Sequence, residues 1–257
     1  MLAGRNDVNF VSQFNSHIAT FSDDGKQFHG AYGHRWRNWF HTDQLKEVVK
    51  TLLYDPNSRR CVLQMWDCDF DLGREGKDFP CNTHIYFDPE PNKLNMTVCN
   101  RSNDIIWGLY GANFVHMSFL HEFVSRSVGM EMGEMYTLSN NFHYYPANLK
   151  HTLPELYADS EKYDEWYEDV GWEDFPPLFE QPEQSETFLA NVESFCKNPA
   201  SAYPYENKFL NRVAVPMYSA WQCYKNRMYD LSVGYCDRIE SPDWRKACRM
   251  WIERRIP

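Results

Sequence analysis

The sequence predicts an α+β fold in which a large mixed β-sheet packs against helices, with a helical extension at the C-terminus. Three observations indicate it. Apolar residues recur at helical spacing in 42–54 and 113–128, short β-prone segments fill 60–99, and aromatic residues at helical spacing fill 213–239. The strands and helices do not alternate strictly, which favours α+β over a doubly wound fold.

The first expected helix covers 42–54, where Thr42 and Asp43 are suited to its N-terminal cap. It ends at the Asp55-Pro56 step. Strands are then expected over 60–66, 83–87 and 94–99, with a turn-rich DPEPN sequence between the last two. A second helix over 113–128 and a strand over 134–138 complete the predicted core.

The rest of the chain divides into two further parts. Residues 155–186 hold twelve carboxylates and one lysine, a pattern typical of a solvated loop or short helices rather than a metal site. After 213–239, Ser241 and Pro242 offer a cap and a first-turn proline for a last helix. We therefore predict a core over 1–150, an acidic, proline-containing segment over 151–212 and C-terminal helices over 213–257.

Composition restricts the classes of partner. The 257 residues carry a formal charge of -10, which disfavours binding to nucleic acid because a phosphate backbone needs a basic face. No apolar run approaches the roughly 18 to 20 residues of a membrane-spanning helix, and the N-terminus does not resemble a signal peptide, so we expect a cytoplasmic protein with no membrane partner. The eight cysteines form no CxxC pair, which favours reduced thiols and argues against a zinc site.

One cysteine differs from the others by its position. Cys81 follows a loop rich in charge and glycine and precedes a β-prone segment, where a thiol can be fixed and still reachable. Cationic neighbours are the usual means of making a cysteine nucleophilic. Arg59 and Arg60 lie between a helix and a strand, and Arg101 follows another strand. The planar fork of arginine suits a phosphate, so these residues are candidates for an anion site, although a surface salt bridge is the ordinary role of any single arginine.

Five motifs stand in one order along the chain, and together they resemble the thymidylate synthase and pyrimidine hydroxymethylase family. The similarity runs from about Gly4 to Tyr145. The motifs are Gly30 to Arg37, which is similar to the family's YGxQWR block, then Asn57 to Arg60, Pro80-Cys81, Arg101 to Asp104 followed by Gly108, and His143 with Tyr145.

This resemblance implies that Cys81 attacks C6 of a pyrimidine nucleotide monophosphate and makes C5 a nucleophile toward the one-carbon unit of 5,10-methylenetetrahydrofolate. Covalent attack divides a difficult substitution into easier steps. The resemblance also implies a homodimer with shared active sites. It assigns Arg101 and Ser102 to the phosphate, Arg59 and Arg60 to the phosphate in the partner subunit's site, Asp104 to folate and the water network, Tyr32 to proton removal from C5, and His143 and Tyr145 to the sugar hydroxyl.

The expected base depends on how the segment from Gly108 to Asn113 is aligned with the family, and two alignments fit. If the segment from Gly108 to Asn113 holds one extra residue, Asn113 stands where the family reads the base. An amide both donates and accepts, which suits the uracil edge, whereas an aspartate at this point suits cytosine. The other alignment places Ala112 there and leaves dUMP and dCMP undecided.

Three departures from the family pattern favour hydroxymethyl transfer over reductive methylation. Asn82 replaces the histidine that follows the cysteine, tryptophans expected before the YG block are absent from 8–21, and the end RRIP differs from the family's closing tail. With weaker shielding of a methylene intermediate, water adds to it and gives a hydroxymethyl product. The sequences NRSND at 100–104 and GLYGAN at 108–113 also resemble those of phage-type homologues that modify DNA precursors. Reductive methylation of dUMP to dTMP is the alternative.

The resemblance finally aligns Met1 to Gly4 with the end of the family's ExxWxLxG helix. The general-acid glutamate and a first phosphate-binding arginine would then precede Met1. A catalytically silent, nucleotide-binding homologue is therefore a further alternative.

Overall fold

The computed structural model describes residues 1–147, 150, 175–199 and 203–257. The chain forms two compact units, Met1–Leu149 and Lys150–Pro257. Much of the acidic segment predicted over 151–212 lies outside the described residues, so the predicted three-part division of the chain stays a prediction.

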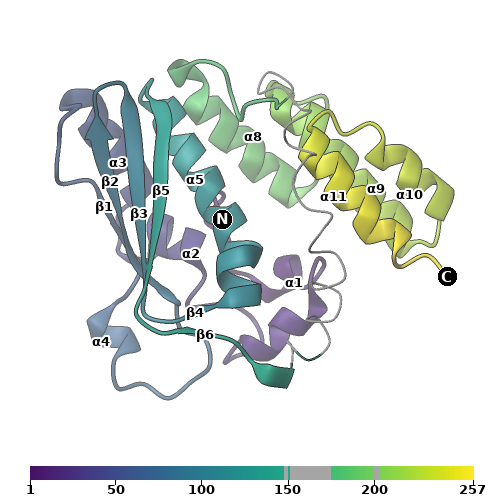
Figure 1. Ribbon diagram of the computed structural model, residues 1–257, viewed down its shortest axis with the longest axis horizontal. Helices are drawn as coiled ribbons and strands as arrows, with labels where there is room; N and C mark the ends of the chain where they lie inside the picture. Colours follow the sequence, from purple (N-terminus) through teal and green to yellow (C-terminus); the bar gives the residue numbers. More distant parts are fainter. Residues whose placement is uncertain (148–149, 151–174, 200–202) are drawn as a thin grey trace. The chain divides into compact units, whose positions relative to one another are not determined.

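A mixed four-stranded sheet forms the centre of the first unit (Figure 1). Its strands stand in the order β1 (Val62–Gln64), β2 (Asn82–Glu90), β3 (Lys93–Asn100) and β5 (Glu131–Ser139). The first three are antiparallel neighbours, whereas β5 runs parallel to β3 and pairs Ser139 with Asn100. The C-terminal ends of β3 and β5 therefore meet at the same edge of the sheet.

Two helices, α3 (Gln44–Tyr54) and α5 (Asn113–Ser127), contact each other and cover one face of this sheet. The Asp43 carboxylate caps α3 by accepting from the Lys46 N–H at 3.3 Å. Spacing of three and four residues turns Leu45, Val48 and Leu52 toward the core, where each buried aliphatic side chain stabilises the fold by roughly 1.5 to 3 kcal/mol. The opposite face of the sheet exposes apolar and aromatic side chains, among them Val62, Tyr86, Tyr136 and Leu138.

Short elements connect these layers and extend the sheet. A two-stranded parallel pair, β4 (Asn103–Asp104) and β6 (Phe142–His143), continues from the ends of β3 and β5. The remaining elements of the first unit are α1 (Val8–Val11), η1 (Ser16–Phe21), α2 (Tyr32–His34), η2 (Arg35–Trp39), α4 (Cys68–Asp71) and η3 (Ile105–Ala112).

The second unit is helical in its described part. Its elements are η5 (Pro182–Gln184), α8 (Ser185–Lys197), η6 (Leu210–Ala214), α9 (Val215–Lys225), α10 (Tyr229–Cys236) and α11 (Pro242–Glu253). Aromatic contacts join two of these helices, because the Trp251 ring of α11 lies 5.5 Å from the Trp221 ring of α9. No helix among the described residues is both long and apolar enough to cross a membrane.

The predicted α+β fold is confirmed, and the predicted helices 42–54 and 113–128 correspond to α3 and α5. The continuous helical pattern over 213–239 is divided, since α9 and α10 are separated around Arg227, which adopts a positive φ of 60°. The β2 strand is longer than the expected 83–87, because Asn82 already pairs with Asn100 and the pairing continues through Glu90, opposite Lys93, into the expected turn.

Candidate active site

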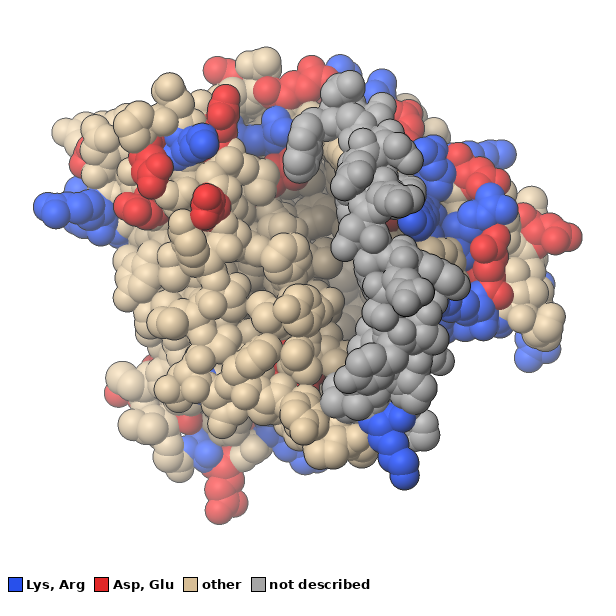
Figure 2. Space-filling view, in the orientation of Figure 1, with Lys and Arg blue, Asp and Glu red and all other residues tan. Residues whose placement is uncertain are grey.

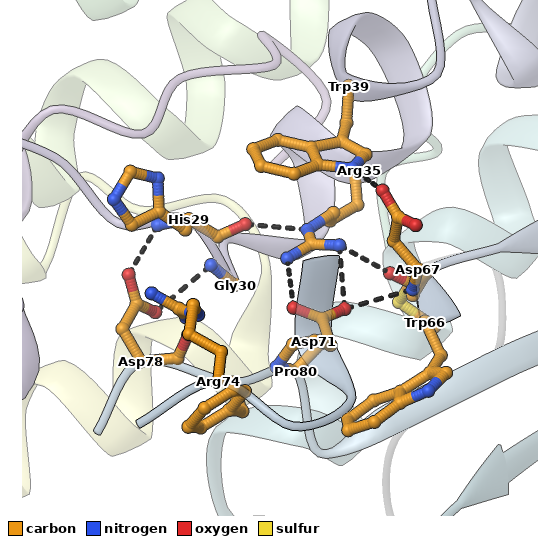
Figure 3. A network of polar contacts seen from close by, with 12 residues as sticks. His29, Gly30, Arg35, Trp39, Trp66, Asp67, Asp71, Arg74, Asp78 and Pro80 are labelled. Carbon is orange, nitrogen blue, oxygen red and sulfur yellow. Dashed lines mark hydrogen bonds and ion pairs between the residues drawn. The ribbon is translucent and has the colours of Figure 1, made fainter. Parts of the chain in front are cut away.

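The segment that leads to Cys81 is held by a buried ion pair (Figure 3). Arg35 and Asp71 have fully buried side chains and make two parallel hydrogen bonds of 2.9 and 2.8 Å. The Arg35 Nε also donates to the His29 carbonyl at 2.6 Å, and its guanidinium stacks 4.1 Å from the Trp39 ring. Arg35 thus joins the YG block, Gly30 to Arg37, to α4, which lies at the start of the loop that precedes Cys81.

A second contact fixes the same loop immediately before Cys81. The Asp78 carboxylate accepts from the backbone N–H of His29 and from that of Gly30, the latter at 3.0 Å (Figure 3). Burial raises the pKa of Asp78, and these two hydrogen bonds oppose that shift. Gly30 approaches so closely that a Cβ there would lie 2.9 Å from the Pro80 nitrogen. The glycine therefore permits the YG block to press against the Pro80-Cys81 step.

Cys81 itself is half-buried and lies directly before β2, at an irregularity in the pairing of β2 with β3. Irregular pairing of this kind often re-aims a side chain next to a functional site. Arg101 is hydrogen-bonded to both residues of the Pro80-Cys81 pair. Its Nε donates to the Pro80 carbonyl at 2.9 Å, and its backbone N–H donates to the Cys81 carbonyl at 3.0 Å. The guanidinium also lies 5.4 Å from the Trp66 ring. A cation is thus held beside the thiol-bearing residue.

Tyr32 connects the thiol to the opposite side of the site. The side chains of Cys81 and Asn113 both lie near its phenol and act on its pKa in opposite directions. Burial, and then the neighbouring Cys81, raise the pKa of the Tyr32 phenol. Three of the predicted residues therefore lie near one another, and the raised pKa keeps the tyrosine protonated near neutral pH.

The location of Asn113 bears on the two alignments of the base-reading position. Asn113 is half-buried at the start of α5, whereas Ala112 is exposed. The preceding η3 is a wide, π-type turn, and its Gly111 departs from helical geometry. A π-type turn holds one more residue than a regular helical turn, which accommodates the extra residue that the Asn113 alignment requires.

The β4 and β6 pair brings two further predicted residues together. Asp104 and His143 are register partners in this parallel pair. One oxygen of Asp104 caps η3 by accepting from the N–H groups of Ile106 and Trp107, at 2.9 and 2.6 Å. Its other oxygen, Oδ2, is buried and has no hydrogen-bond partner in the part of the chain that the structure describes. That oxygen is available to a ligand donor.

The remaining predicted residues are placed less centrally. Ser102 is half-buried between Arg101 and Asn103, and Tyr145 is 57% exposed, with its ring edge-on to His143 at 5.3 Å. Arg59 and Arg60 are exposed at the turn before β1. None of the interactions found among the described residues joins either arginine to Cys81.

The fold brings four asparagines together. Asn82, Asn100, Asn103 and Asn113 line one small pocket between the sheet and α5. The Nδ2 of Asn82 donates to the Oδ1 of Asn100, and the Nδ2 of Asn103 donates to the Ser139 hydroxyl at 3.0 Å. The sequence marks Asn82 as a departure from the family pattern and Asn113 as a base-reading candidate, but it does not indicate that they share a pocket with Asn100 and Asn103.

Gly108 explains why a glycine follows the Arg101 to Asp104 motif. A Cβ at Gly108 would collide with the Oδ1 of Asn103 and would lie 3.4 Å from the Nδ2 of Asn113. The glycine therefore leaves room for both amides in the pocket.

Comparison with known proteins identifies the family. A half-buried thiol on a segment held by an arginine, near a tyrosine and a polar pocket, is an arrangement suited to enzymes that act by covalent catalysis. Residues 1–165 match the family described as "Thymidylate synthase", and the chain belongs to this family of folate-using one-carbon transferases that act on pyrimidine nucleotide monophosphates.

Two phage proteins named "Deoxyuridylate hydroxymethyltransferase" are among the relatives. The protein of Pseudomonas phage M6 is 42% identical over 99% of this chain and 74% of its own length. The protein of Bacillus phage SP01 is 36% identical over 56% of this chain and 41% of its own length, so the matched region spans less than half of that relative. Among solved structures, thymidylate synthase from T4 phage is similar with a TM-score of 0.49 and 20% identity, covering 60% of this chain and 58% of that chain.

Proposed function

We propose that this protein transfers a hydroxymethyl group to C5 of dUMP, with Cys81 as the nucleophile that attacks C6. The observation that carries the proposal is the pocket that Asn82, the residue after Cys81, shares with Asn113, because it places the thiol beside an amide that suits uracil. The M6 relative, which matches almost the whole chain, bears a name with the same substrate and reaction.

The proposed reaction begins at the thiol. Attack of the Cys81 sulfur on C6 makes C5 electron-rich, and C5 then forms a bond to the one-carbon unit. 5,10-Methylenetetrahydrofolate supplies that unit at the oxidation level of formaldehyde. Tyr32 lies near Cys81, and we assign its protonated phenol to hold the water that takes up the C5 proton. Loss of that proton breaks the bond from the one-carbon unit to the folate nitrogen, which releases tetrahydrofolate and leaves a methylene group doubly bonded to C5. Addition of water to this methylene carbon, followed by departure of the thiolate from C6, gives the hydroxymethyl nucleotide.

The described residues fit a folate and a nucleotide. The buried Oδ2 of Asp104, which lacks a partner among them, suits an N–H donor of a pterin ring. The proposed nucleotide contacts are Arg101 and Ser102 to the phosphate, and His143 and Tyr145 to the sugar hydroxyl. Arginine is suited to the phosphate because it donates parallel hydrogen bonds from a planar fork.

Arg59 and Arg60 lead us to propose a homodimer in which each subunit completes the phosphate site of the other. Both are exposed at the turn before β1, next to a sheet face that carries Val62, Tyr86 and Tyr136. Figure 2 shows a broad uncharged surface over β5, with the charged side chains gathered at its margins. An apolar surface of this kind is suited to a subunit interface. We place the reaction in the cytoplasm, the host cytoplasm for a phage protein.

Product analysis tests the proposal. The chain is incubated with 5,10-methylenetetrahydrofolate and either dUMP or dCMP labelled with tritium at C5, and both tritium release and nucleotide mass are followed. We expect release from dUMP and a product heavier by one hydroxymethyl group, with Cys81→Ser inactive. A methylated product would instead identify a dTMP-forming enzyme, and tight dUMP binding without release of tritium would identify a silent homologue.

A further inference from the structure

We infer that Asn82 and Asn103 together hold the water molecule that becomes the hydroxyl group of the product. They are positioning residues for the hydration step, and the inference rests on the proposed function of Cys81. The two asparagine side chains select water as the nucleophile of the last bond-forming step.

The first observation is a pair of buried acceptors. Asn82 is 1% exposed and Asn103 is 2% exposed, and the Oδ1 of each has no hydrogen-bond partner among the residues that the structure describes. Their Nδ2 groups are already engaged, with Asn100 and with Ser139, so each amide has its orientation fixed by a neighbour. A buried amide oxygen without a donor is costly, which indicates that a donor from a ligand or a water completes both.

The second observation is that both residues line one pocket. Asn82 comes from the start of β2 and Asn103 from β4, and Asn113 at the start of α5 completes the polar wall. Buried waters typically have about two to four polar partners. One water that donates its two hydrogens to two amide oxygens keeps its lone pairs directed away from them, which is the orientation that a nucleophile requires.

The pocket adjoins the proposed covalent centre. Asn82 directly follows Cys81 in the chain, and Asn113 lines the same pocket as Asn82. A base attached to the Cys81 sulfur and read by Asn113 therefore has its C5 substituent close to the asparagine pair.

The chemistry balances without a further reactant. After one-carbon transfer the nucleotide carries a methylene group doubly bonded to C5 and a sulfur bond at C6. The water oxygen bonds to the methylene carbon, the double bond moves to C5–C6, and the C6–S bond breaks with its electron pair leaving on sulfur. The proton lost by the water is balanced by protonation of the released Cys81 thiolate.

Gly108 provides independent support for a built site. Any side chain at Gly108 would displace the Oδ1 of Asn103, so the glycine preserves the position of that acceptor. Asn82 also stands where the family pattern has a histidine, which places one of the two acceptors at a point where this chain departs from that pattern.

The test measures how the intermediate is partitioned. Wild-type protein, Asn82→Leu and Asn103→Leu are given C5-tritiated dUMP and 5,10-methylenetetrahydrofolate with 2-mercaptoethanol, a thiol that competes with water for the methylene carbon. We expect the leucine variants to release tritium while hydroxymethyl product per tritium released falls by roughly tenfold to a hundredfold. The thioether product should rise to balance it.

Matched variants separate this role from a structural one. Asn103→Asp keeps an acceptor oxygen, since the Ser139 hydroxyl can turn to donate, and should restore the wild-type ratio. Asn95→Leu removes a buried amide from the same sheet whose groups are bonded to Glu90 and Glu134, and it should leave the ratio unchanged. Asn82→Ala and Asn103→Ala replace the leucine variants if these do not fold.

An unchanged ratio in variants that still release tritium would overturn the role of the asparagines and leave the proposed function standing. No tritium release from the wild-type protein would instead refute the proposed function, and this inference with it.

Discussion

The Nε of Arg101 donates to the carbonyl of Pro80 at 2.9 Å, so the cation is fixed on the residue that precedes the thiol. The Arg101 backbone N–H also donates to the Cys81 carbonyl, and β2 and β3 are thereby joined where the reactive residue leaves the sheet. One arginine thus holds the segment that carries Cys81, and in the proposed function the same arginine binds the phosphate.

Arg101→Lys tests this double role. A lysine keeps the charge but loses the fixed fork, and charge-assisted hydrogen bonds contribute about 1.5 to 3 kcal/mol each. We expect kcat/KM for dUMP to fall by roughly tenfold to a hundredfold. Arg126→Lys is the control, because Arg126 forms a partly buried ion pair with Glu122 within α5. Equal effects of the two changes would contradict the assignment.

Thiol labelling tests which cysteine is reactive. Burial raises the pKa of Cys236 and of Cys248 to about 11, so both stay protonated at pH 7.5. We expect iodoacetamide to label Cys81 and the exposed Cys68, and dUMP to protect Cys81 alone, as read by peptide mass. Cys68 serves as the internal control. Protection of both residues, or of neither, would argue against a nucleotide at Cys81.

The same shifts give a pH dependence of stability. Because the pKa of Cys236 and of Cys248 is higher in the folded protein than the usual value near 9, their stabilising effect is complete below about pH 9 and is lost as the pH rises through about 11. We expect urea midpoints to fall over this interval, and to fall less in Cys236→Ala than in the wild-type protein. A midpoint that stays level up to pH 11 would contradict this.

Gly108→Ala tests the packing of the asparagine pocket. The added methyl group collides with the Oδ1 of Asn103, so we expect the free energy of unfolding to fall by about 1 to 3 kcal/mol, together with weaker dUMP binding. Gly234→Ala in α10 is the matched control, since its Cβ would meet no atom within 4 Å. That change should stabilise the protein by roughly 0.5 to 1 kcal/mol.

We expect the Arg35–Asp71 ion pair to stabilise the loop that precedes Cys81 more than any other contact there. Removing one partner leaves a buried charge, so Asp71→Asn and Arg35→Gln should each lower the free energy of unfolding by about 3 to 5 kcal/mol. Arg249→Gln on the exposed surface should change it by about 1 kcal/mol or less. Urea unfolding measures all three, and a mild effect of Asp71→Asn would show that the loop is held by other contacts.

Sequence reasoning reached the fold because its main elements carry local signals. The apolar spacing of Leu45, Val48 and Leu52 is visible without a structure, and so is the cap at Asp43. The break between α9 and α10 is less visible, since Arg227 adopts a left-handed conformation without a glycine to indicate it.

The site was only partly predictable for a related reason. The motif order pointed to Cys81, Tyr32 and Asn113, which lie near one another in the structure. The asparagine pocket depends on strand register instead, because Asn82 meets Asn100 only through the pairing of β2 with β3. Pairings of this kind join distant segments and leave no short motif.

The most direct test of the account is the mass of the Cys81 peptide after incubation with 5,10-methylenetetrahydrofolate and a dUMP analogue that carries fluorine at C5. Fluorine cannot leave as a proton does, so the covalent intermediate persists. We predict one nucleotide and one folate bound per thiol, on Cys81 alone, and none in Cys81→Ser. An unmodified Cys81 peptide, or an adduct on another cysteine, would contradict the assignment of Cys81 as the nucleophile.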